Sequence, residues 1–240
     1  MIELKNLSIA NDPGHPLLSD VSLTLPAATL TALIGRNGCG KSTLLRTLSG
    51  LQKPRAGSVF IDGRDCFRTP PCMLSRMVAA VSTEIVRIDN LTCREMVGMA
   101  RSPYTGLFGR LSDEDRRIVD SALASVGMES FASRPVARLS DGEARRIMIA
   151  RALAQSTPVI LLDEPTGFLD VPGRYEICAL LGRLAREQNK TIVFSTHELE
   201  PAFAQADAVA LIHDCGLHLM PPDRMRQQPM FRQLFGPPGQ

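Results

Sequence analysis

A glycine-rich segment in the first quarter of the chain has the residue types and spacing of a phosphate-binding loop. It reads Gly35-Arg36-Asn37-Gly38-Cys39-Gly40-Lys41-Ser42, with Thr43 directly after it. Its glycines would let successive backbone amides point at phosphate oxygens, and a helix beginning at its end would add partial positive charge. Lys41 would then reach the terminal phosphates of a nucleoside triphosphate, and Ser42 would ligate Mg2+. A chance glycine-rich turn is expected in about one chain of this length in a hundred, so the segment predicts nucleotide binding.

Two adjacent carboxylates follow a short aliphatic run later in the chain. Asp163 and Glu164 come directly after residues 159–162. Ligands of open α/β sheets bind beyond the carboxyl ends of the strands, so both acids should face the phosphate site. Asp163 would hold Mg2+ directly or through water, and Glu164 would polarise the water that attacks the γ-phosphate. The alternative is a pair of acids on a solvated strand end, and the phosphate loop favours the catalytic interpretation.

A histidine closes another short apolar run of the same kind. His197 follows residues 191–196. A lone histidine in this position is more often structural or exposed to solvent. At the end of a strand of the same sheet, however, it could hydrogen-bond the γ-phosphate or position Glu164. We therefore place His197 with Lys41 and Glu164 in the predicted catalytic group.

A third segment with chemical potential reads Leu139-Ser140-Asp141-Gly142-Glu143. Its simplest interpretation is a capping box, in which Ser140 caps a helix and Glu143 reaches back to it. A glycine in the first turn of a helix costs about 1 kcal/mol relative to alanine, and it permits close approach by a ligand. The serine hydroxyl, the exposed amides and the helix dipole together would form a second phosphate-binding surface.

The elements that must position these residues follow from hydrophobic periodicity and from breaks. Residues 2–9, 21–25, 30–34 and 58–61 are typical of strands, and Asn11-Asp12-Pro13-Gly14 and Pro26 interrupt them. Thr92, Ser112 and Ser140 each open an apolar-periodic helix. Strands are expected again at 159–162 and 191–194, with a helix from about 174 to 188 between them. An α/β core interrupted by a helical insert is therefore predicted, and the Pro-, Gln- and Met-rich end predicts a helix followed by a loose tail.

Composition limits the classes of function. The chain has 240 residues, a net charge of +2 and a hydrophobic fraction of 44%, which are ordinary values for a globular protein. The weak charge argues against a dedicated nucleic-acid binder. Its six scattered cysteines are typical of reduced thiols in a cytosolic protein. No run approaches the roughly 18 apolar residues needed to cross a bilayer, and the first residues do not resemble a secretion signal, so a membrane role would require a partner.

With these motifs in this order, the sequence resembles the ATP-binding cassette ATPase family, whose signature LSGGQ corresponds to LSDGE at residues 139–143. The resemblance implies an α/β fold: a P-loop NTPase (RecA-like) core with an N-terminal antiparallel β portion and an inserted α-helical subdomain. It implies one domain over residues 1–240. We expect the core at about 1–84 and 157–235, the helical subdomain at about 85–156, and a loose tail at about 236–240.

The resemblance also implies cofactors and partners. ATP and Mg2+ would be bound between two copies of the chain in a head-to-tail homodimer. Ser140 and Gly142 of one copy would cover the nucleotide held by the phosphate loop of the other, and Asp170 would lie in the loop that links the two sites. The dimer would sit peripherally on the cytoplasmic face of the inner plasma membrane. There it would drive polytopic permease subunits, with a substrate-binding protein as an indirect partner and no nucleic acid.

The sequence departs from the family pattern at two places and resembles one branch of the family elsewhere. The family often stacks an aromatic side chain on adenine near Ala10-Asn11, and none is present there. Thr83 stands where the family carries a glutamine, and its hydroxyl could contact Mg2+ only through water. Residues 90–104 and 107–112 resemble the iron-chelate, haem and cobalamin uptake branch. Two alternatives remain at this point: a cassette that acts on nucleic acid or on the ribosome, and a nucleotide-binding regulator that does not hydrolyse. The absence of a long coiled-coil insert or second cassette argues against the first, and Glu164 argues against the second.

Overall fold

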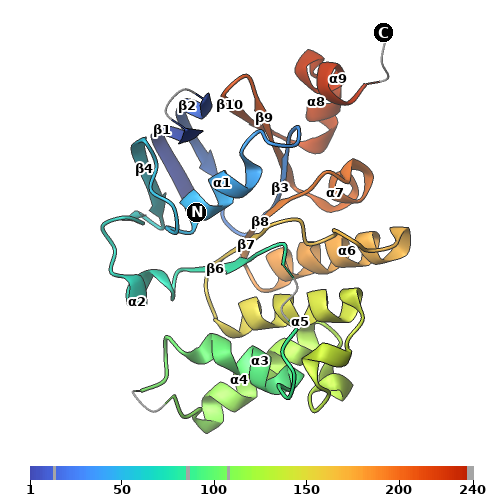
Figure 1. Cartoon of the computed structure of the whole chain (residues 1–240). Coiled ribbons are helices and arrows are strands. Elements are labelled where there is room, and N and C mark those ends of the chain that lie inside the picture. Colours follow the sequence, from blue (N-terminus) through green and yellow to red (C-terminus); the bar gives the residue numbers. More distant parts are fainter. Residues whose placement is uncertain (13–14, 85–86, 107–108, 237–240) are drawn as a thin grey trace.

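Two β-sheets form the upper part of the molecule in Figure 1. The computed structural model describes residues 1–12, 15–84, 87–106 and 109–236. The smaller sheet is antiparallel, with the order β2-β1-β4-β5. Its strands are β1 (Ile2–Asp12), β2 (His15–Leu25), β4 (Ala56–Ile61) and β5 (Arg64–Asp65). The predicted N-terminal antiparallel portion is therefore present, with longer strands than the sequence pattern indicated.

The larger sheet has six strands in the order β10-β9-β3-β8-β7-β6. They are β3 (Leu30–Ile34), β6 (Val78–Val81), β7 (Val159–Leu162), β8 (Thr191–Ser195), β9 (Ala208–His213) and β10 (Gly216–Met220). The strands from β9 to β6 are parallel, and β10 pairs antiparallel with β9. Parallel strands end at the same edge of a sheet, so the segments after β3, β7 and β8 come together there. The β9–β10 hairpin was not predicted.

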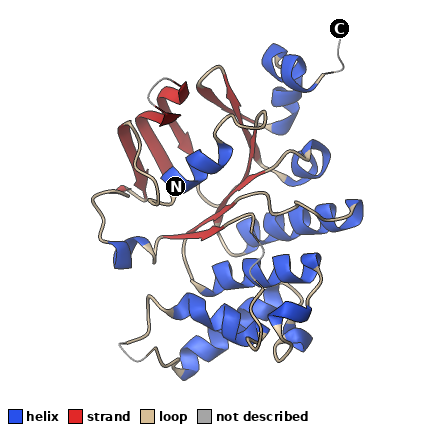
Figure 2. Ribbon diagram, in the orientation of Figure 1, coloured by secondary structure: helices blue, strands red, loops and turns tan. Residues whose placement is uncertain are grey.

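Helices cover the larger sheet and form the insert, as Figure 2 shows. The insert contains α3 (Cys93–Gly98), α4 (Asp113–Ser125) and α5 (Asp141–Ala154), which gather in the lower part of the view. The others are α1 (Lys41–Leu48), α2 (Pro71–Leu74), α6 (Val171–Glu187), α7 (Leu199–Gln205), α8 (Pro222–Gln227) and α9 (Pro229–Phe235). Single 3-10 turns occupy Met99–Arg101, Glu129–Phe131 and Val136–Arg138.

The three helices of the insert begin where the sequence predicted. Thr92, Ser112 and Ser140 each accept a hydrogen bond from the backbone amide three residues on, and the acidic side chain at that position bonds back to the cap. These reciprocal bonds satisfy amides that a helix leaves unpaired at its start. The predicted helix near residues 174–188 begins earlier, because Asp170 caps it through the amide of Gly173.

The carboxyl-terminal prediction is confirmed in part. A helical region is present, but it is divided into α8 and α9 at Gln228–Pro229, where proline removes a backbone donor. Residues 237–240 of the predicted tail lie outside the described residues, as do 13–14 of the predicted first turn and 107–108 of the branch-like segment. The division into core and helical subdomain remains a prediction.

Two hydrophobic clusters lie on opposite faces of the larger sheet. Leu30, Ala32 and Ile34 of β3 face a cluster that also contains α3, α4, α5 and α6. Leu33 faces the other cluster, which is built from the smaller sheet and α1. This alternation follows from the two-residue period of a strand. Because the insert shares a cluster with the sheet, it is packed onto the core rather than tethered to it. Within the described residues, no helix is long and apolar enough to cross a membrane.

Candidate nucleotide-binding site

The predicted phosphate loop connects β3 to α1 at the carboxyl edge of the larger sheet. Gly38 and Gly40 have φ angles of 80° and 103°, in the region that favours glycine. Gly40 is the residue before α1, and within the described residues no side chain caps that helix and no acid lies in its first turn. The start of α1 therefore keeps the partial positive charge of the helix dipole without a capping side chain or a nearby acid of its own first turn, and this arrangement favours a bound anion.

Lys41 is folded back into the loop. Its ammonium donates to the carbonyl oxygens of Gly35 at 2.9 Å and Arg36 at 3.2 Å, and the residue is 7% exposed. These carbonyls are neutral acceptors, so an anion in the loop would offer the ammonium a stronger, charge-assisted bond. Lys41 is thus held at the position where a phosphate group would meet it.

A cavity of about 430 Å3, here called the phosphate cavity, lies in front of the loop. Its lining combines three segments distant in sequence: Asn37, Gly38, Gly40, Lys41, Ser42, Thr43, Glu164 and His197. The fold thus brings the predicted catalytic group of Lys41, Glu164 and His197 to one place. The roles assigned to these residues remain predictions.

The acidic pair is oriented by a serine of the neighbouring strand. Ser195 donates to Oδ1 of Asp163 at 2.6 Å and accepts from the amide of Glu164 at 2.9 Å. Glu164 has a positive φ of 47°, which a non-glycine residue adopts at some energetic cost. The backbone of Asp163 is fixed as well, because its amide donates to the carbonyl of Val81 at 2.9 Å. Both acids therefore have defined positions beyond β7.

His197 lies beside Glu164 and is half exposed. Its Nδ1 atom is 3.6 Å from Oε1 of Glu164, and its Nε2 atom is 3.3 Å from Oε1 of Glu198. Glu198 in turn pairs with Arg174 at 2.6 Å. The imidazole ring therefore lies between two carboxylates, within reach of both the cavity and the acid predicted to activate water.

The signature residues occupy a different cavity of about 510 Å3, here called the signature cavity. Its lining includes Ser140, Gly142 and Asp170. The amide of Ser140 donates to Glu143 at 2.7 Å, and this bond holds the pKa of the Glu143 carboxyl below its usual range. The lining residues of the signature cavity and the phosphate cavity do not overlap. One chain therefore presents the two predicted halves of the nucleotide site at separate places.

The remaining predicted residues are distributed around these cavities. Arg36, Gly38 and Cys39 line another cavity of about 510 Å3, between the start of β2 and the β9–β10 turn. Burial raises the pKa of the Cys39 thiol, while the nearby Lys41 acts in the opposite direction. Thr83 follows β6 and does not line the phosphate cavity.

Sequence reasoning missed two residues that contact the predicted site residues and their neighbours: Ser195 and Arg174. Ser195 directly follows the predicted strand at 191–194 and is the last residue of β8, but a small polar residue beside an apolar run does not reveal its partner. Arg174 pairs with Glu198 and also donates to the carbonyl of Leu169 at 2.9 Å, which joins the segment after β7 to the segment after β8. Polar side chains next to the motif residues were the only available signal.

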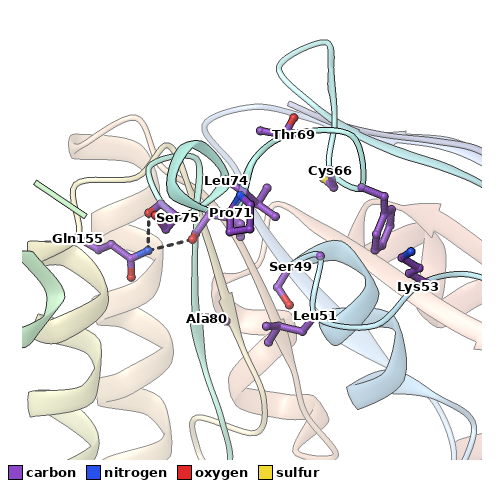
Figure 3. A pocket seen from close by; sticks show the side chains of 13 residues that line it. Ser49, Leu51, Lys53, Cys66, Thr69, Pro71, Leu74, Ser75, Ala80 and Gln155 are labelled. Carbon is purple, nitrogen blue, oxygen red and sulfur yellow. Dashed lines mark hydrogen bonds between the residues drawn. The ribbon is translucent and has the colours of Figure 1, made fainter. Parts of the chain in front are cut away.

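A cavity of about 590 Å3, here called the boundary cavity, lies between the core and the insert (Figure 3). Leu51, Pro71, Leu74 and Ala80 contribute to its lining from the core, and Gln155 contributes from the end of α5. Gln155 donates to the carbonyls of Ser75 at 2.6 Å and Val78 at 3.1 Å. Leu51 is 72% exposed, so this hollow has an apolar rim open to solvent.

Comparison with known proteins identifies relatives of this architecture. Residues 18–167 match the family model described as ABC transporter. The Bacillus subtilis iron(3+)-hydroxamate import ATP-binding protein FhuC is 38% identical over 218 residues, which cover 88% of this chain and 81% of the relative. The Bacillus anthracis petrobactin import ATP-binding protein FpuD is 35% identical over 236 residues, covering 98% and 86%.

Solved structures agree with the sequence relatives. An inward-facing, putative metal-chelate type ABC transporter superposes with a TM-score of 0.85 at 27% identity, covering 98% of this chain and 88% of that chain. A dimeric ATP-binding cassette in a post-hydrolysis state, bound to ADP and Pi, superposes with a TM-score of 0.79 at 29% identity, covering 92% and 99%. The predicted fold class is therefore confirmed.

Proposed function

The chain belongs to the ABC transporter family, and on that premise we propose that it is the ATP-hydrolysing subunit of an importer for iron-siderophore, haem or cobalamin-type chelates. The observation that carries this proposal is the phosphate cavity, which unites the phosphate loop with Glu164 and His197. The names of the relatives support the class of cargo, since they include import proteins for iron(3+)-hydroxamate, petrobactin and ferric enterobactin. The presence of a metal-chelate type transporter among the structural neighbours supports the same class of cargo.

Hydrolysis would proceed by attack of water on the γ-phosphate. Glu164 would accept a hydrogen bond from that water, Lys41 would neutralise the terminal phosphates, and His197 would contact the γ-phosphate or orient Glu164. The loop amides and the start of α1 would hold the remaining phosphate oxygens. These roles agree with the lining of the phosphate cavity, which Lys41, Glu164 and His197 all border.

Ser42 and Asp163 are suited to hold the Mg2+ that accompanies ATP. A hydroxyl and a carboxylate are oxygen donors of the kind that Mg2+ prefers, and Ser195 fixes one oxygen of Asp163. When bound, the ion would offset negative charge on the β- and γ-phosphates. Thr83 would contribute only through a water molecule.

A second copy of the chain would complete the site. Ser140 and Gly142 line a cavity other than the one bordered by Lys41, so the second phosphate-binding surface must come from elsewhere. Dimeric cassette structures among the neighbours support a homodimer, and the separation of the two cavities on one chain favours a head-to-tail arrangement. In that arrangement Ser140 and Gly142 of one copy cover the triphosphate held by the other, and Asp170 lies between the two sites.

The boundary cavity is suited to receive the permease. It lies between the core and the insert, and its exposed Leu51 offers an apolar contact for a cytoplasmic helix of a polytopic partner (Figure 3). Through that contact the dimer would sit peripherally on the cytoplasmic face of the inner membrane. A substrate-binding protein would then act on the complex only indirectly.

Hydrolysis and its dependence on Glu164 test this function. We expect the purified chain to release phosphate from ATP in the presence of Mg2+, and Glu164→Gln to lower turnover at least about a hundredfold, since general-base catalysis contributes about 10²–10⁴. The mutant should still bind ATP and should form an ATP-dependent dimer on size-exclusion chromatography. Glu187→Gln makes the same substitution at an exposed position of α6 and serves as the control. Absence of hydrolysis by the wild-type chain would overturn the proposal.

A further inference from the structure

Arg145 is a fully buried arginine that joins the signature helix to the segment after β6. It lies in the second turn of α5, five residues after Ser140, and is 0% exposed. Its guanidinium donates to the carbonyl of Ser82 at 3.2 Å and to that of Thr83 at 3.1 Å. Motif reasoning did not assign it a role, and the proposed catalytic steps do not use it.

The environment of Arg145 connects it with the acidic pair. Burial lowers the pKa of its guanidinium, while the carboxylates of Asp141, Asp163 and Glu164 oppose that shift. The backbone gives a second connection, because Val81, next to Ser82, accepts the amide hydrogen bond of Asp163 at 2.9 Å. A continuous set of contacts therefore runs from α5 through Arg145 and the end of β6 to the backbone of Asp163.

The hydrogen bonds that Arg145 makes do not satisfy all the polar atoms of its buried guanidinium. In the part of the chain that the structure describes, its Nε atom has no hydrogen-bond partner. Taking a guanidinium out of water is unfavourable, and an apolar side chain of similar volume is often equally stabilising. Packing alone is therefore a poor reason for an arginine here, whereas its two forked donors provide a bond to each of two successive carbonyls.

Helix α5 holds β6 at both ends. Arg145 bonds to the carbonyls that follow the strand, and Gln155, directly after the helix, bonds to the carbonyls of Ser75 and Val78 where the strand begins. Gln155 borders the boundary cavity, and Ser140, at the other end of α5, borders the signature cavity. Hydrogen bonds from the two ends of α5 therefore fix both ends of β6, and one end of α5 borders the boundary cavity while the other borders the signature cavity.

We propose that Arg145 is a positioning residue for ATP hydrolysis, which fixes the Ser82–Thr83 backbone to the signature helix so that Thr83, Ser140 and Asp163 keep one relative geometry. The inference rests on the proposed function. Arg145 acts through these neighbours and does not touch the phosphate cavity itself. Its loss therefore weakens the chemical step and leaves the affinity of the phosphate loop for ATP unchanged.

Kinetics of the full-length chain test this role. Arg145→Gln removes the charge and one arm of the fork, so kcat should fall at least tenfold while KM for ATP and the affinity for a fluorescent ATP analogue change less than twofold. Arg145→Lys keeps the charge but replaces the planar fork with a single nitrogen, which cannot reproduce the two separate donor positions. Its kcat should therefore lie between those of wild type and Arg145→Gln, at least threefold below wild type. Should Arg145→Gln fail to fold, Arg145→Lys decides the question.

Arg101→Gln is the matched control. Arg101 is also a buried arginine that donates to a backbone carbonyl at α5, that of Ala154, but it lies at the opposite end of the helix. Its replacement should lower the thermal midpoint with kcat within twofold of wild type. Wild-type kcat in Arg145→Lys, or equal losses of kcat in Arg145→Gln and Arg101→Gln, would overturn the inference. Failure of the wild-type chain to hydrolyse ATP would instead overturn the proposed function.

Discussion

The hydroxyl of Ser195 donates a hydrogen bond of 2.6 Å to the carboxylate of Asp163. The same oxygen accepts the amide hydrogen of Glu164 at 2.9 Å, and Ser195 is 0% exposed. One buried side chain on β8 therefore sets the direction of two successive acids after β7. The alignment of the predicted metal ligand and the predicted general base depends on a residue that contacts neither ATP nor metal in the proposed mechanism.

Replacing Ser195 with alanine should misorient both acids. We expect Ser195→Ala to raise the Mg2+ concentration needed for half-maximal hydrolysis, to lower kcat about tenfold, and to lower the free energy of unfolding by about 1–3 kcal/mol, because a buried amide and a carboxylate lose their partner. Mg2+ titration of ATPase activity and urea unfolding measure these effects. Ser121→Ala, at an exposed position of α4, is the control. An unchanged Mg2+ titration would show that Ser195 does not orient the metal ligand.

The residues that could be predicted are those whose function follows from local sequence. The phosphate loop needs its glycines and Lys41 within eight positions, and Glu164 and His197 each stand close after a recognisable apolar strand. The capping boxes are equally local, so the starts of the insert helices were predicted correctly. Local hydrogen bonds and strand periodicity are properties of a short segment, which a single sequence displays directly.

The supporting residues could not be predicted, because their partners are distant in the chain. Ser195 reaches Asp163 only because β8 lies beside β7, and Arg145 reaches Thr83 only because α5 packs along β6. The order of strands depends on the packing of the whole domain. The β9–β10 hairpin was missed for a different reason: the apolar run from Ala208 ends at Asp214-Cys215-Gly216, and no strand was predicted on either side of this turn.

Ser140 provides a test of the second copy. Ser140→Arg places a long cation at the start of α5, where the proposed partner's triphosphate would approach, so ATP-driven dimerisation in a Glu164→Gln background should be lost. ATP binding by the monomer should persist, because the phosphate cavity does not include Ser140. Loss of the helix cap should cost only about 1 kcal/mol, so the chain should stay folded.

Size-exclusion chromatography with and without ATP measures this effect, and binding of a fluorescent ATP analogue confirms that the monomer is intact. Ser121→Arg introduces the same side chain at an exposed position of α4 and should dimerise normally. An ATP-dependent dimer of the Ser140→Arg chain would contradict the cross-subunit role of the signature.

The ion pair of Arg101 and Asp115 inside the insert predicts a loss of stability in acid. Nε of Arg101 donates to Asp115 at 2.8 Å, and Ser112 donates to the other carboxylate oxygen through its hydroxyl at 2.7 Å and its amide at 2.9 Å. The Ser112 hydroxyl, followed by Arg101, lowers the pKa of Asp115 from 3.8 to about 2. Because the pKa is lower in the folded state, this carboxylate stabilises the fold above its unfolded value of 3.8. That contribution is lost as the pH falls through about 4 toward about 2.

Asp115→Asn should therefore lower the free energy of unfolding at pH 7 by about 3 kcal/mol, because it leaves a buried guanidinium without its counter-ion. Thermal and urea unfolding of both proteins at pH 7, 5, 4 and 3 should show a difference that is constant down to pH 5 and then narrows, since protonation of Asp115 makes the wild-type side chain resemble the mutant. Asp113→Asn, at an exposed position in the first turn of the same helix, should show a much smaller difference at every pH. If the wild type and Asp115→Asn lost stability in parallel down to pH 3, the charged form of Asp115 would not be what holds α4 against α5.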